Sequence, residues 1–435
     1  MKIKSIYIIT LVLVFLPKMR AQELLLLEDA VKIALENNYE IKLAKNELKI
    51  DELNNTAGNA GMLPTINALV TDNNSITNTK QTQADGSERT LDGARNMNLT
   101  YGVGLDWTVF DGLRMFARKE QLNILQKQGE AELKLAILTK ISEVYLNYFD
   151  LVQQQQQLAA IDTAIVISQE RVTTAQNRFS IGKASKLEVL NAQVDLNTDK
   201  SLQLKQLETL KNAKIRLNEI LARDVQTEFV VANEISVDEQ LKYDDLKSAA
   251  ENQNPQLQAQ ILTKNSAEQQ LKQVKAGRYP TIRITSGYNF TRSEASLGFI
   301  TQSSNRGFAY GFNASMPIFN GNLQNRNERI AKVQLENANV TLEQQKRSLE
   351  SQLNAAFASY TTNLELTKVE AQNLKIAEQN LDITLAKFKI GTITPIEFRT
   401  AQQNFLEAKV RYSNALYLTK IHEITLKELA GSLRF

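Results

Sequence analysis

Two segments of the chain alternate between apolar and polar positions. In residues 98–109 the odd positions are Leu, Tyr, Val, Leu, Trp and Val, and the even positions are small or polar. Residues 308–318 repeat the arrangement with Phe, Tyr, Phe, Ala, Met and Ile at the even positions. A period of two predicts β-strands with one apolar and one polar face. A length of about eleven residues suits a tilted strand that crosses a membrane.

Each of these strands has an expected partner that begins upstream at a proline, Pro64 or Pro280. The predicted strand pairs are 64–76 with 97–110 and 280–291 with 307–319. The polar segments 72–95 and 291–307 are the expected loops within the pairs. Long polar loops and aromatic residues near strand ends are typical of outer-membrane barrels. Half-buried strands in a soluble α+β domain are the alternative interpretation.

Other segments have the composition of long helices. Residues 322–390 contain neither Gly nor Pro, and residues 183–276 contain one Pro and no Gly. Both are rich in Ala, Leu, Gln, Glu and Lys, which lose little side-chain freedom in a helix. The segment 113–179 is interrupted only by Gly129 and predicts a helix of about 67 residues, roughly 100 Å long. Such a helix suits a tube that crosses the periplasm or a coiled-coil rod.

The sequence contains an internal repeat. Three motifs recur at an offset of 209 residues. The first is Phe110-Asp111-Gly112, which recurs as Phe319-Asn320-Gly321. The others are Phe179-Ser180-Ile181-Gly182, which recurs as Phe388-Lys389-Ile390-Gly391, and Ala192-Gln193, which recurs as Ala401-Gln402. The sequence ALENN at 34–38 matches AENQN at 250–254. These matches predict an internal two-fold duplication. The first repeat covers 22–226 and the second 227–435, each with a helix, a strand pair and a long helical hairpin, with tips near 180–185 and 389–394.

The N-terminus has the layout of a secretory signal. Lys2 and Lys4 precede an apolar run over 5–16, which is too short to span a bilayer as a helix. We therefore expect a signal peptide over 1–21 and an exported protein. The whole chain has 51 basic and 48 acidic residues, and four of the basic residues lie in the signal peptide. The mature chain is thus nearly neutral and offers no basic surface for nucleic acid.

Residue types that carry chemistry are scarce. The chain has no Cys and a single His, His422. It therefore lacks the residues for disulfides, thiolate metal sites and lipid attachment, and has one candidate for histidine-based catalysis. The sequence contains no arrangement typical of a catalytic, phosphate-binding or metal site. We expect no enzyme, metal or cofactor. Four strands per chain cannot close a barrel, and open strand edges cannot lie in lipid, so a membrane role needs three chains and twelve strands.

The order of these features resembles the TolC-like outer-membrane efflux protein (outer membrane factor) family over essentially the whole mature chain. The resemblance rests on the pattern Leu27-x-x-Ala30-x-x-x-Ala34-Leu35-x-Asn37-Asn38, the Leu63-Pro64 strand start and the doubled Phe-(Asp/Asn)-Gly junctions between strand and helix. It implies a mixed α/β membrane protein that is a homotrimer. A 12-strand β-barrel would cross the outer-membrane lipid of a Gram-negative bacterium and continue into a 12-helix α-helical coiled-coil barrel in the periplasm.

The resemblance also implies a function and partners. Such proteins are exit ducts of tripartite efflux or type I secretion systems, in which an inner-membrane pump of RND or ABC type supplies the energy and a periplasmic membrane-fusion adaptor joins pump to duct. The cargo stays open, because drugs, metal ions, small metabolites and secreted proteins leave through similar ducts. A surface-anchored coiled-coil structural protein or adhesin is the alternative, although the duplicated strand pairs argue against it.

Both repeats spell a tight helical hairpin. Gly182 and Gly391 suit the left-handed conformation that closes a helix C-terminus. The sequences from Ser185 to Glu188 and from Thr394 to Glu397 then read S/T-x-x-E, a capping box for the next helix. Pro395 is favoured in the first turn of that helix. Making the turn is the simplest role of these residues.

The family resemblance gives the tips a second role, as the surface on which the adaptor docks. The implied docking positions are Arg178, Phe179, Ile181, Gly182, Lys387, Phe388, Ile390 and Gly391. An apolar side chain beside an exposed turn is unfavourable in water, so a partner that covers it is a reasonable inference. Glu188 and Glu397 are expected to cap helices or, with Arg399, to form a gate at the periplasmic entrance. Since Arg399 has no counterpart in the first tip, we expect the gate in the second.

Overall fold

The computed structural model describes residues 23–296 and 300–433. The expected signal peptide over 1–21 lies outside these described residues. The chain forms two compact units. One, which we call the hairpin unit, comprises residues 23–44, 133–255 and 346–433, and the other, the sheet unit, comprises 45–132 and 256–345.

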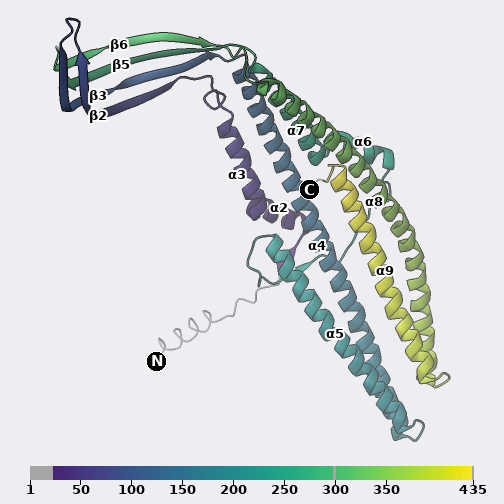
Figure 1. Cartoon of the computed structure of the whole chain (residues 1–435). Helices are drawn as coiled ribbons and strands as arrows, with labels where there is room; N and C mark the ends of the chain where they lie inside the picture. The colour runs from purple at the N-terminus through teal and green to yellow at the C-terminus, as the bar shows by residue number, and fades with distance from the viewer. Residues whose placement is uncertain (1–22, 297–299, 434–435) are drawn as a thin grey trace, which may run out of the picture. The chain divides into compact units, whose positions relative to one another are not determined.

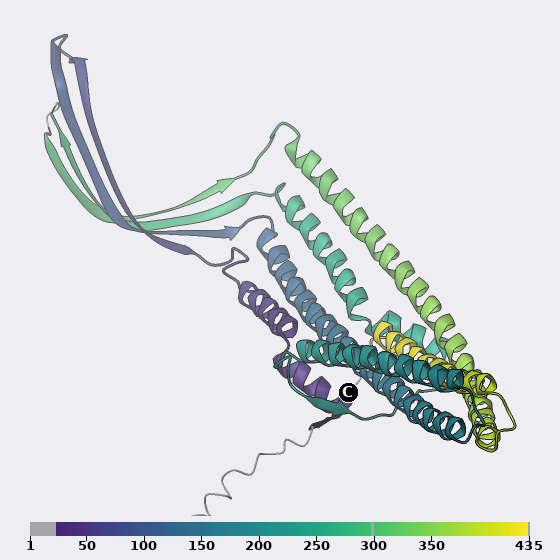
Figure 2. The same cartoon turned by 90° about the horizontal axis from the view of Figure 1, so that it is seen from below.

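A four-stranded antiparallel sheet dominates the sheet unit (Figure 1). Its strands, in the order in which they pair, are β2 (Thr65–Thr82), β3 (Glu88–Phe110), β5 (Thr281–Ala295) and β6 (Gln302–Ser315). Each half of the chain supplies one strand hairpin, and β3 and β5 join the two hairpins. Figure 2 shows the four strands curving together along their length. Among the described residues, β2 and β6 are the edge strands of this sheet.

The strands extend further than the sequence indicated. The segment 72–95, expected to be a loop, is mostly strand, because β2 continues to Thr82 and β3 begins at Glu88. The second expected loop, 291–307, is likewise too long, because β5 continues to Ala295 and β6 begins at Gln302. The alternation of apolar residues stops in these outer segments while the backbone pairing continues, so the hydrophobic pattern marks only part of each strand.

The pairing register gives the sheet an apolar face and a polar face, since directly opposite residues share a face. The apolar face carries Ile66, Ala68 and Val70 on β2, Tyr101, Val103, Leu105 and Trp107 on β3, Ile284, Tyr288 and Phe290 on β5, and Phe308, Tyr310 and Phe312 on β6. Most of these side chains are exposed in the single chain. The rings of Tyr101 and Phe290 stack across the β3–β5 pair with centroids 5.1 Å apart.

Two pairs of long helices dominate the hairpin unit, to which α4 and α8 contribute their C-terminal parts (Figure 1). The first hairpin is α4 (Arg114–Ser180) with α5 (Lys186–Ile220), and the second is α8 (Leu323–Ile390) with α9 (Pro395–Leu429). The 67 residues of α4 confirm the expected helix length. The shorter helices are α2 (Leu27–Asn37) and α3 (Tyr39–Asn54) before the first strand pair, and α6 (Tyr243–Gln253) and α7 (Pro255–Ala276) before the second.

The core of the hairpin unit gathers around a parallel pair of short strands, β1 (Glu23–Leu25) and β4 (Phe229–Val231). Leu25 and Phe229 are fully buried and pack in one cluster with apolar residues of α4. The Tyr148 hydroxyl of α4 donates to the Leu25 carbonyl oxygen at 3.0 Å and accepts from the Ala232 amide at 3.3 Å. One buried tyrosine therefore holds both strands to α4.

Two buried asparagines explain why ALENN recurs as AENQN. Asn38 Nδ2 donates to the Ile220 carbonyl oxygen at the end of α5 at 3.0 Å, and Asn38 Oδ1 accepts from the Glu40 amide at 2.9 Å. Asn254 Nδ2 donates in the same way to the Leu429 carbonyl oxygen at the end of α9, at 2.9 Å. Each side chain satisfies a carbonyl group that its helix leaves unpaired, and Asn38 also caps the start of α3.

We expect Asn38→Ala to lower the free energy of unfolding by about 1–3 kcal/mol, because the substitution leaves a buried carbonyl and a helix-start amide without partners. Thermal unfolding followed by far-UV circular dichroism measures this loss. Asn37→Ala, which alters an exposed neighbour, is the matched control and should leave the unfolding temperature unchanged. Equal unfolding temperatures for the Asn38 variant and the parent protein would contradict the capping role.

Candidate functional site: the helical hairpin tips

Each hairpin turns through a left-handed glycine. Gly182 has a φ of 74° and Gly391 a φ of 79°. At the first tip the Gly182 amide donates to the Phe179 carbonyl oxygen at 3.0 Å, and the Lys183 amide donates to the Arg178 carbonyl oxygen at 2.7 Å. The second tip has the same pair of bonds, from Gly391 to Phe388 and from Thr392 to Lys387. These bonds form a Schellman motif, in which a side chain at the glycine position is strained.

The two tips differ in how the next helix begins. At the second tip Thr394 Oγ1 accepts from the Glu397 amide at 3.2 Å, and the Glu397 carboxylate accepts from the Thr394 amide at 2.9 Å. This is a complete capping box. At the first tip Ser185 Oγ accepts from the Glu188 amide at 3.2 Å, but the Glu188 carboxylate turns away toward Arg178. The expected capping box is therefore complete only in the second tip.

Arg178 links the first tip to the second. Its Nη1 lies 3.7 Å from Glu188 Oε1, and its guanidinium carbon lies 5.9 Å from the centroid of the Phe388 ring. A side chain on Gly391 would begin 3.7 Å from Arg178 Nη2. The guanidinium thus sits against an aromatic ring and a glycine of the other hairpin, an arrangement that favours a cation.

Among the docking residues expected from the sequence, the exposed apolar side chains are Phe179, Ile181 and Ile390, at 43%, 65% and 75% relative accessibility. Phe388 is buried and stacks on Phe398 with ring centroids 4.9 Å apart. The expectation that the tip residues share one exposed surface is therefore corrected for Phe388, which α8 and α9 enclose in their own core. Lys387 is exposed, and Lys389 Nζ pairs with Glu170 Oε1 of α4 at 2.7 Å.

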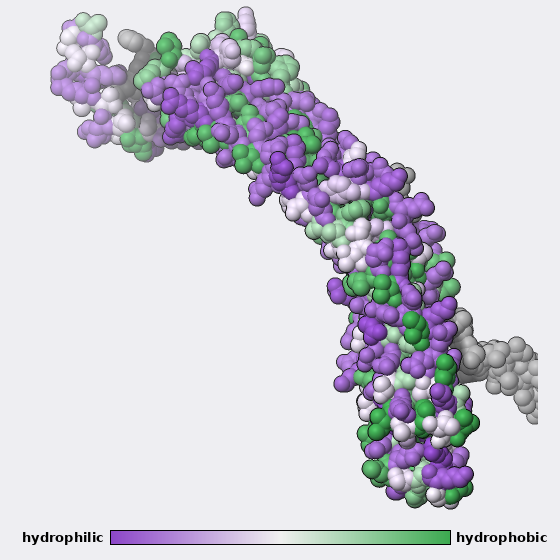
Figure 3. All heavy atoms as spheres, turned by 90° about the vertical axis from the view of Figure 1, so that its right-hand side faces the viewer, coloured by the Kyte–Doolittle hydropathy of each residue, from purple (hydrophilic) through white to green (hydrophobic). Residues whose placement is uncertain are grey.

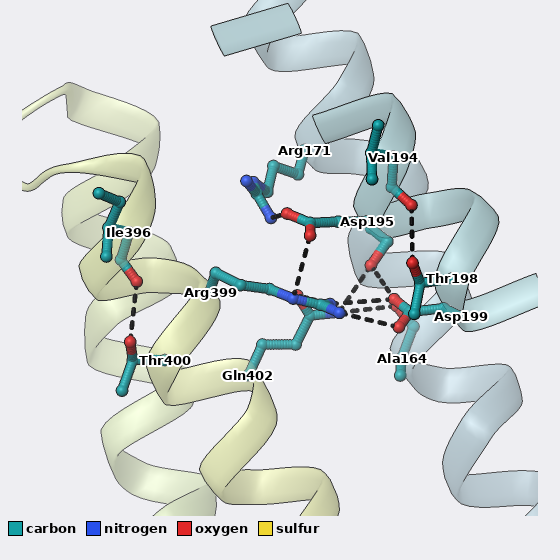
Figure 4. A network of polar contacts seen from close by, with 11 residues as sticks. Ala164, Arg171, Val194, Asp195, Thr198, Asp199, Ile396, Arg399, Thr400 and Gln402 are labelled. Atoms are coloured by element: carbon teal, nitrogen blue, oxygen red, sulfur yellow. Dashed lines mark hydrogen bonds and ion pairs between the residues drawn. The ribbon is translucent and has the colours of Figure 1, made fainter. Parts of the chain in front are cut away.

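A network of charged side chains joins the two hairpins near the tips (Figure 4). Arg399 of α9 donates to both carboxylate oxygens of Asp199 on α5, each at 3.1 Å. Asp195, one turn earlier on α5, lies 3.7 Å from the Arg399 guanidinium and pairs with Arg171 of α4 at 2.5 Å. The side chains of Asp199 and Arg171 are only 3% and 5% exposed. Charges buried to this degree depend on their partners.

Gln402 adds neutral hydrogen bonds to this network. Its Nε2 donates to Ser168 Oγ at 2.8 Å and to the Ala164 carbonyl oxygen at 2.9 Å, both on α4. Its Oε1 accepts from Arg399 at 3.2 Å, and the Ser168 hydroxyl donates to Asp199. One glutamine therefore connects α9, α4 and the buried carboxylate of α5.

The structure shows the contacts that two of the candidate gate residues make within one chain. Glu397 caps its own helix, and Arg399 pairs with Asp199 instead of Glu397. Sequence reasoning missed Asp199, because an acidic residue on a long polar helix gives no sign of a partner 200 positions away. It also missed the pairing of Arg171 on α4 with Asp195 on α5. The recurrence of Ala-Gln at 401–402 was the available signal, and it marks the position of Gln402 without naming its contacts.

The hairpins are apolar inside, and polar side chains join them along part of the α4–α9 contact. Apolar clusters hold each one together: Val172, Ala175, Val189, Ala192 and Leu196 in the first, and Leu381, Phe388, Phe398 and Phe405 in the second. Between α4 and α9, Gln153 donates to Asn414 at 3.1 Å and Ser413 donates to Gln156 at 2.8 Å. Ile167 adds an apolar contact. We call this α4–α9 contact, with Ser168, Arg399 and Gln402, the polar seam.

The strand-to-helix junctions have the same geometry in both halves. Gly112 and Leu113 have φ values of 72° and 69°, and Gly321 and Asn322 have φ values of 65° and 62°. Asp111 Oδ1 accepts from the Met115 amide at 3.2 Å, and Asn320 Oδ1 accepts from the Gln324 amide at 3.4 Å. Phe110 ends β3, whereas Phe319 lies past β6 and is 80% exposed. The repeated motif is thus a helix-starting turn.

Exposed apolar side chains recur along α8 at intervals of seven residues. They are Val369, Ile376, Ile383 and Ile390, each at least 55% exposed. Figure 3, which shows the molecule from the α8 side, displays hydrophobic side chains reaching the surface along the helical part. Leu187, Leu190 and Val194 are exposed on α5 with spacings of three and four. We call these two sets the α8 row and the α5 row, and their period is that of a coiled-coil contact.

Among the described residues, no helix has the length and apolar character needed to span a membrane.

The family model of outer membrane efflux proteins matches residues 30–223 and 246–432. The outer membrane protein TolC of Escherichia coli K12 is 24% identical over 266 residues, which are 59% of this chain and 54% of TolC. TolC of Salmonella enteritidis is 24% identical over 263 residues, which are 59% and 53%. The match spans about half the length of these relatives.

Two solved structures show the same fold at low identity. The CmeC outer membrane channel of Campylobacter jejuni has a TM-score of 0.78 at 17% identity, and the match covers 93% of this chain and 85% of CmeC. The outer membrane protein VceC of Vibrio cholerae has a TM-score of 0.77 at 16% identity, with 93% and 96% covered. The chain therefore belongs to the outer membrane efflux protein family, whose members are non-enzymatic channels of the Gram-negative outer membrane.

Proposed function

We propose that this protein is the exit duct of a tripartite efflux or type I secretion system, a passive conduit from the periplasm to the outside that an inner-membrane pump drives. The observation that carries the proposal is the sheet, in which one face is apolar and exposed and the edge strands β2 and β6 pair on one side only. Lipid cannot satisfy unpaired backbone amides and carbonyls. The sheet therefore needs strands at both edges, and further copies of the chain can supply them.

The proposed assembly is a homotrimer with an internal two-fold duplication in each chain. Three copies of the sheet would close a twelve-strand barrel, with the apolar face against outer-membrane lipid. The α8 row of one copy would pack on the α5 row of the next in a coiled-coil contact, and twelve helices would form an α-helical barrel. Without such neighbours, both rows would remain exposed to water.

The tips are the proposed docking surface for a periplasmic adaptor, which would connect the duct to a pump of RND or ABC type. Phe179 and Ile181 give the first tip an apolar surface, and Lys387 adds a positive charge at the second. Ile390 also belongs to the α8 row, so either a neighbouring copy or the adaptor would cover it. An apolar helical hairpin with acidic flanks is the partner that matches this chemistry.

We place the gate at the polar seam rather than at Glu397. Pulling one hairpin apart would expose apolar side chains at about 1.5–3 kcal/mol each. Hydrogen bonds across the seam can be replaced by water at a net cost of only about 0.5–1.5 kcal/mol each. The Arg399–Asp199 pair is the exception, because separation would leave a buried charge without its partner. This ion pair is the proposed latch between the hairpins.

The position of the apolar face can be tested with Trp107, the single tryptophan of the chain. It lies opposite Ile284 on the apolar face, so brominated lipids in vesicles should quench its fluorescence strongly. Thr108 lies on the polar face at the same depth, so the tryptophan of a Trp107→Phe, Thr108→Trp variant should respond to a water-soluble quencher instead. A tryptophan at 107 that brominated lipids fail to quench would refute the lipid contact.

The docking role predicts that Gly182→Asp or Gly391→Asp abolishes efflux while trimer and membrane insertion persist. Either substitution places a strained, charged side chain in the turn. Dye accumulation and resistance to toxic compounds in a complemented deletion strain provide the readout. Gly86→Asp is the control, since Gly86 also has a positive φ, of 82°, with open space around it, but lies in the β2–β3 turn. Normal resistance in the tip variants at normal expression would reject the docking surface.

The latch predicts that Asp199→Asn raises the open probability of the duct in planar bilayers and lowers stability by about 3 kcal/mol, because Arg399 loses its buried partner. The double variant Asp199→Asn, Arg399→Gln should recover part of the stability, since no unpaired charge remains. Glu365→Gln, which removes one partner of an exposed pair with Lys368, is the control and should cost less than about 1 kcal/mol. Parent-like stability and opening in Asp199→Asn would argue against a latch.

A further inference from the structure

The polar face of the sheet has no net charge between the Thr108–Arg283 row and the Thr77–Ala94 row. In the paired rows from Thr65 to Thr77 of β2 and across the other strands, it presents Thr, Asn, Ser, Gly and Ala with one apolar exception, Leu69. Asp106 is the charged side chain in these described rows, and Arg283 lies in the adjoining row with Thr108 and Asn313. Arg283 Nε lies 3.5 Å from Asp106 Oδ1. The two charges are therefore paired within the face.

One row in the middle of this face carries three small residues, two glycines and an alanine, beside one asparagine. Asn67, Gly104, Gly287 and Ala309 form one row across all four strands, beside a hollow of about 580 Å³. Packing requires glycine at Gly102, because a Cβ there would collide with the Tyr288 carbonyl oxygen. At Gly104 the nearest atom would be 3.9 Å away. Because glycine inside a strand costs stability, packing leaves Gly104 unexplained, whereas an unobstructed wall explains it.

We propose that the polar face is a charge-neutral wall of the outer-membrane passage, which admits hydrophilic and amphipathic solutes of either charge sign and limits them by size. This inference rests on the proposed trimeric barrel, in which the polar face lines the passage. Three-fold symmetry would turn any unpaired carboxylate into a ring of three, and such rings favour cations. The pairing of Asp106 with Arg283 prevents a ring of either sign.

The spacing of the pair explains why it leaves little field in the passage. At 3.5 Å, the separation of the two charges is well below the Debye length of about 8 Å at physiological salt. A passing ion therefore meets a compact dipole instead of a net charge. Amides and hydroxyls elsewhere on the face offer hydrogen bonds to solutes of both signs. Discrimination by charge would then belong to the adaptor and pump.

The test is the ratio of cation to anion permeability, obtained from reversal potentials of the reconstituted trimer in a salt gradient. Asp106→Asn leaves the arginine and should shift the ratio toward anions by at least about two-fold, and Arg283→Gln should shift it equally toward cations. The double variant, and the exchange Asp106→Arg with Arg283→Asp, should both return the parent ratio. Arg292→Gln removes a charge from the other face of β5 and should change nothing.

Two kinds of failure can be separated. The trimer could conduct while neither single variant shifts the permeability ratio, or while both shift it in the same direction. Either result would reject the proposal of a charge-neutral wall and leave the proposed duct function intact. The same holds if the exchange variant, which keeps a pair, fails to return the parent ratio. If the purified protein forms no trimer and conducts no ions, the proposed duct itself fails.

Discussion

A sheet cannot lie in lipid while the backbone groups of its edge strands lack hydrogen-bond partners. The proposed assembly and the role of the exposed helix rows depend on this constraint. The apolar face of β2, β3, β5 and β6 suits hydrocarbon, but β2 and β6 leave backbone groups unpaired in the single chain. The proposed closure by further copies would resolve the conflict, and it would require each copy to present contacts on both flanks. The α8 and α5 rows have the spacing that such contacts need. With no cysteine in the chain, packing and assembly must provide the stability.

The distribution of apolar and polar contacts separates the parts that are rigid from the parts that can move. The interiors of both hairpins and the core around β1 and β4 are apolar, and rearranging them would expose large side chains. The polar seam is different, because amides and hydroxyls can exchange partners with water at small net cost. A duct that opens needs one weak interface among strong ones. We propose that the seam is that interface and that the Arg399–Asp199 pair sets the free energy needed to open it.

Local patterns in the sequence determined much of the fold and little of the network at the tips. The period of two located the apolar strands, the absence of Gly and Pro gave the length of α4, and the two glycines placed the turns, because each is a local property of the backbone. The strand extensions beyond residues 76 and 291 were missed, since polar side chains occupy both faces there. The burial of Phe388 depends on packing across the turn against Phe398, and Arg399 pairs with Asp199 200 positions away. No local pattern encodes either contact.

Comparing positions at the offset of 209 residues shows that the two similar hairpins carry different charged residues on their contact surfaces. Asp199 corresponds to Ala408 and Arg399 corresponds to Leu190, so each partner of the latch exists in only one half. Arg171 and Asp195 correspond to Asn380 and Asn404. Two identical hairpins could pair through either flank. Complementary charges that occur once each direct α9 to the α4–α5 hairpin of the same chain. In the proposed trimer, the apolar α8 and α5 rows would contact neighbouring copies. The charged network therefore specifies which contacts form within a chain, in addition to its proposed role as a latch.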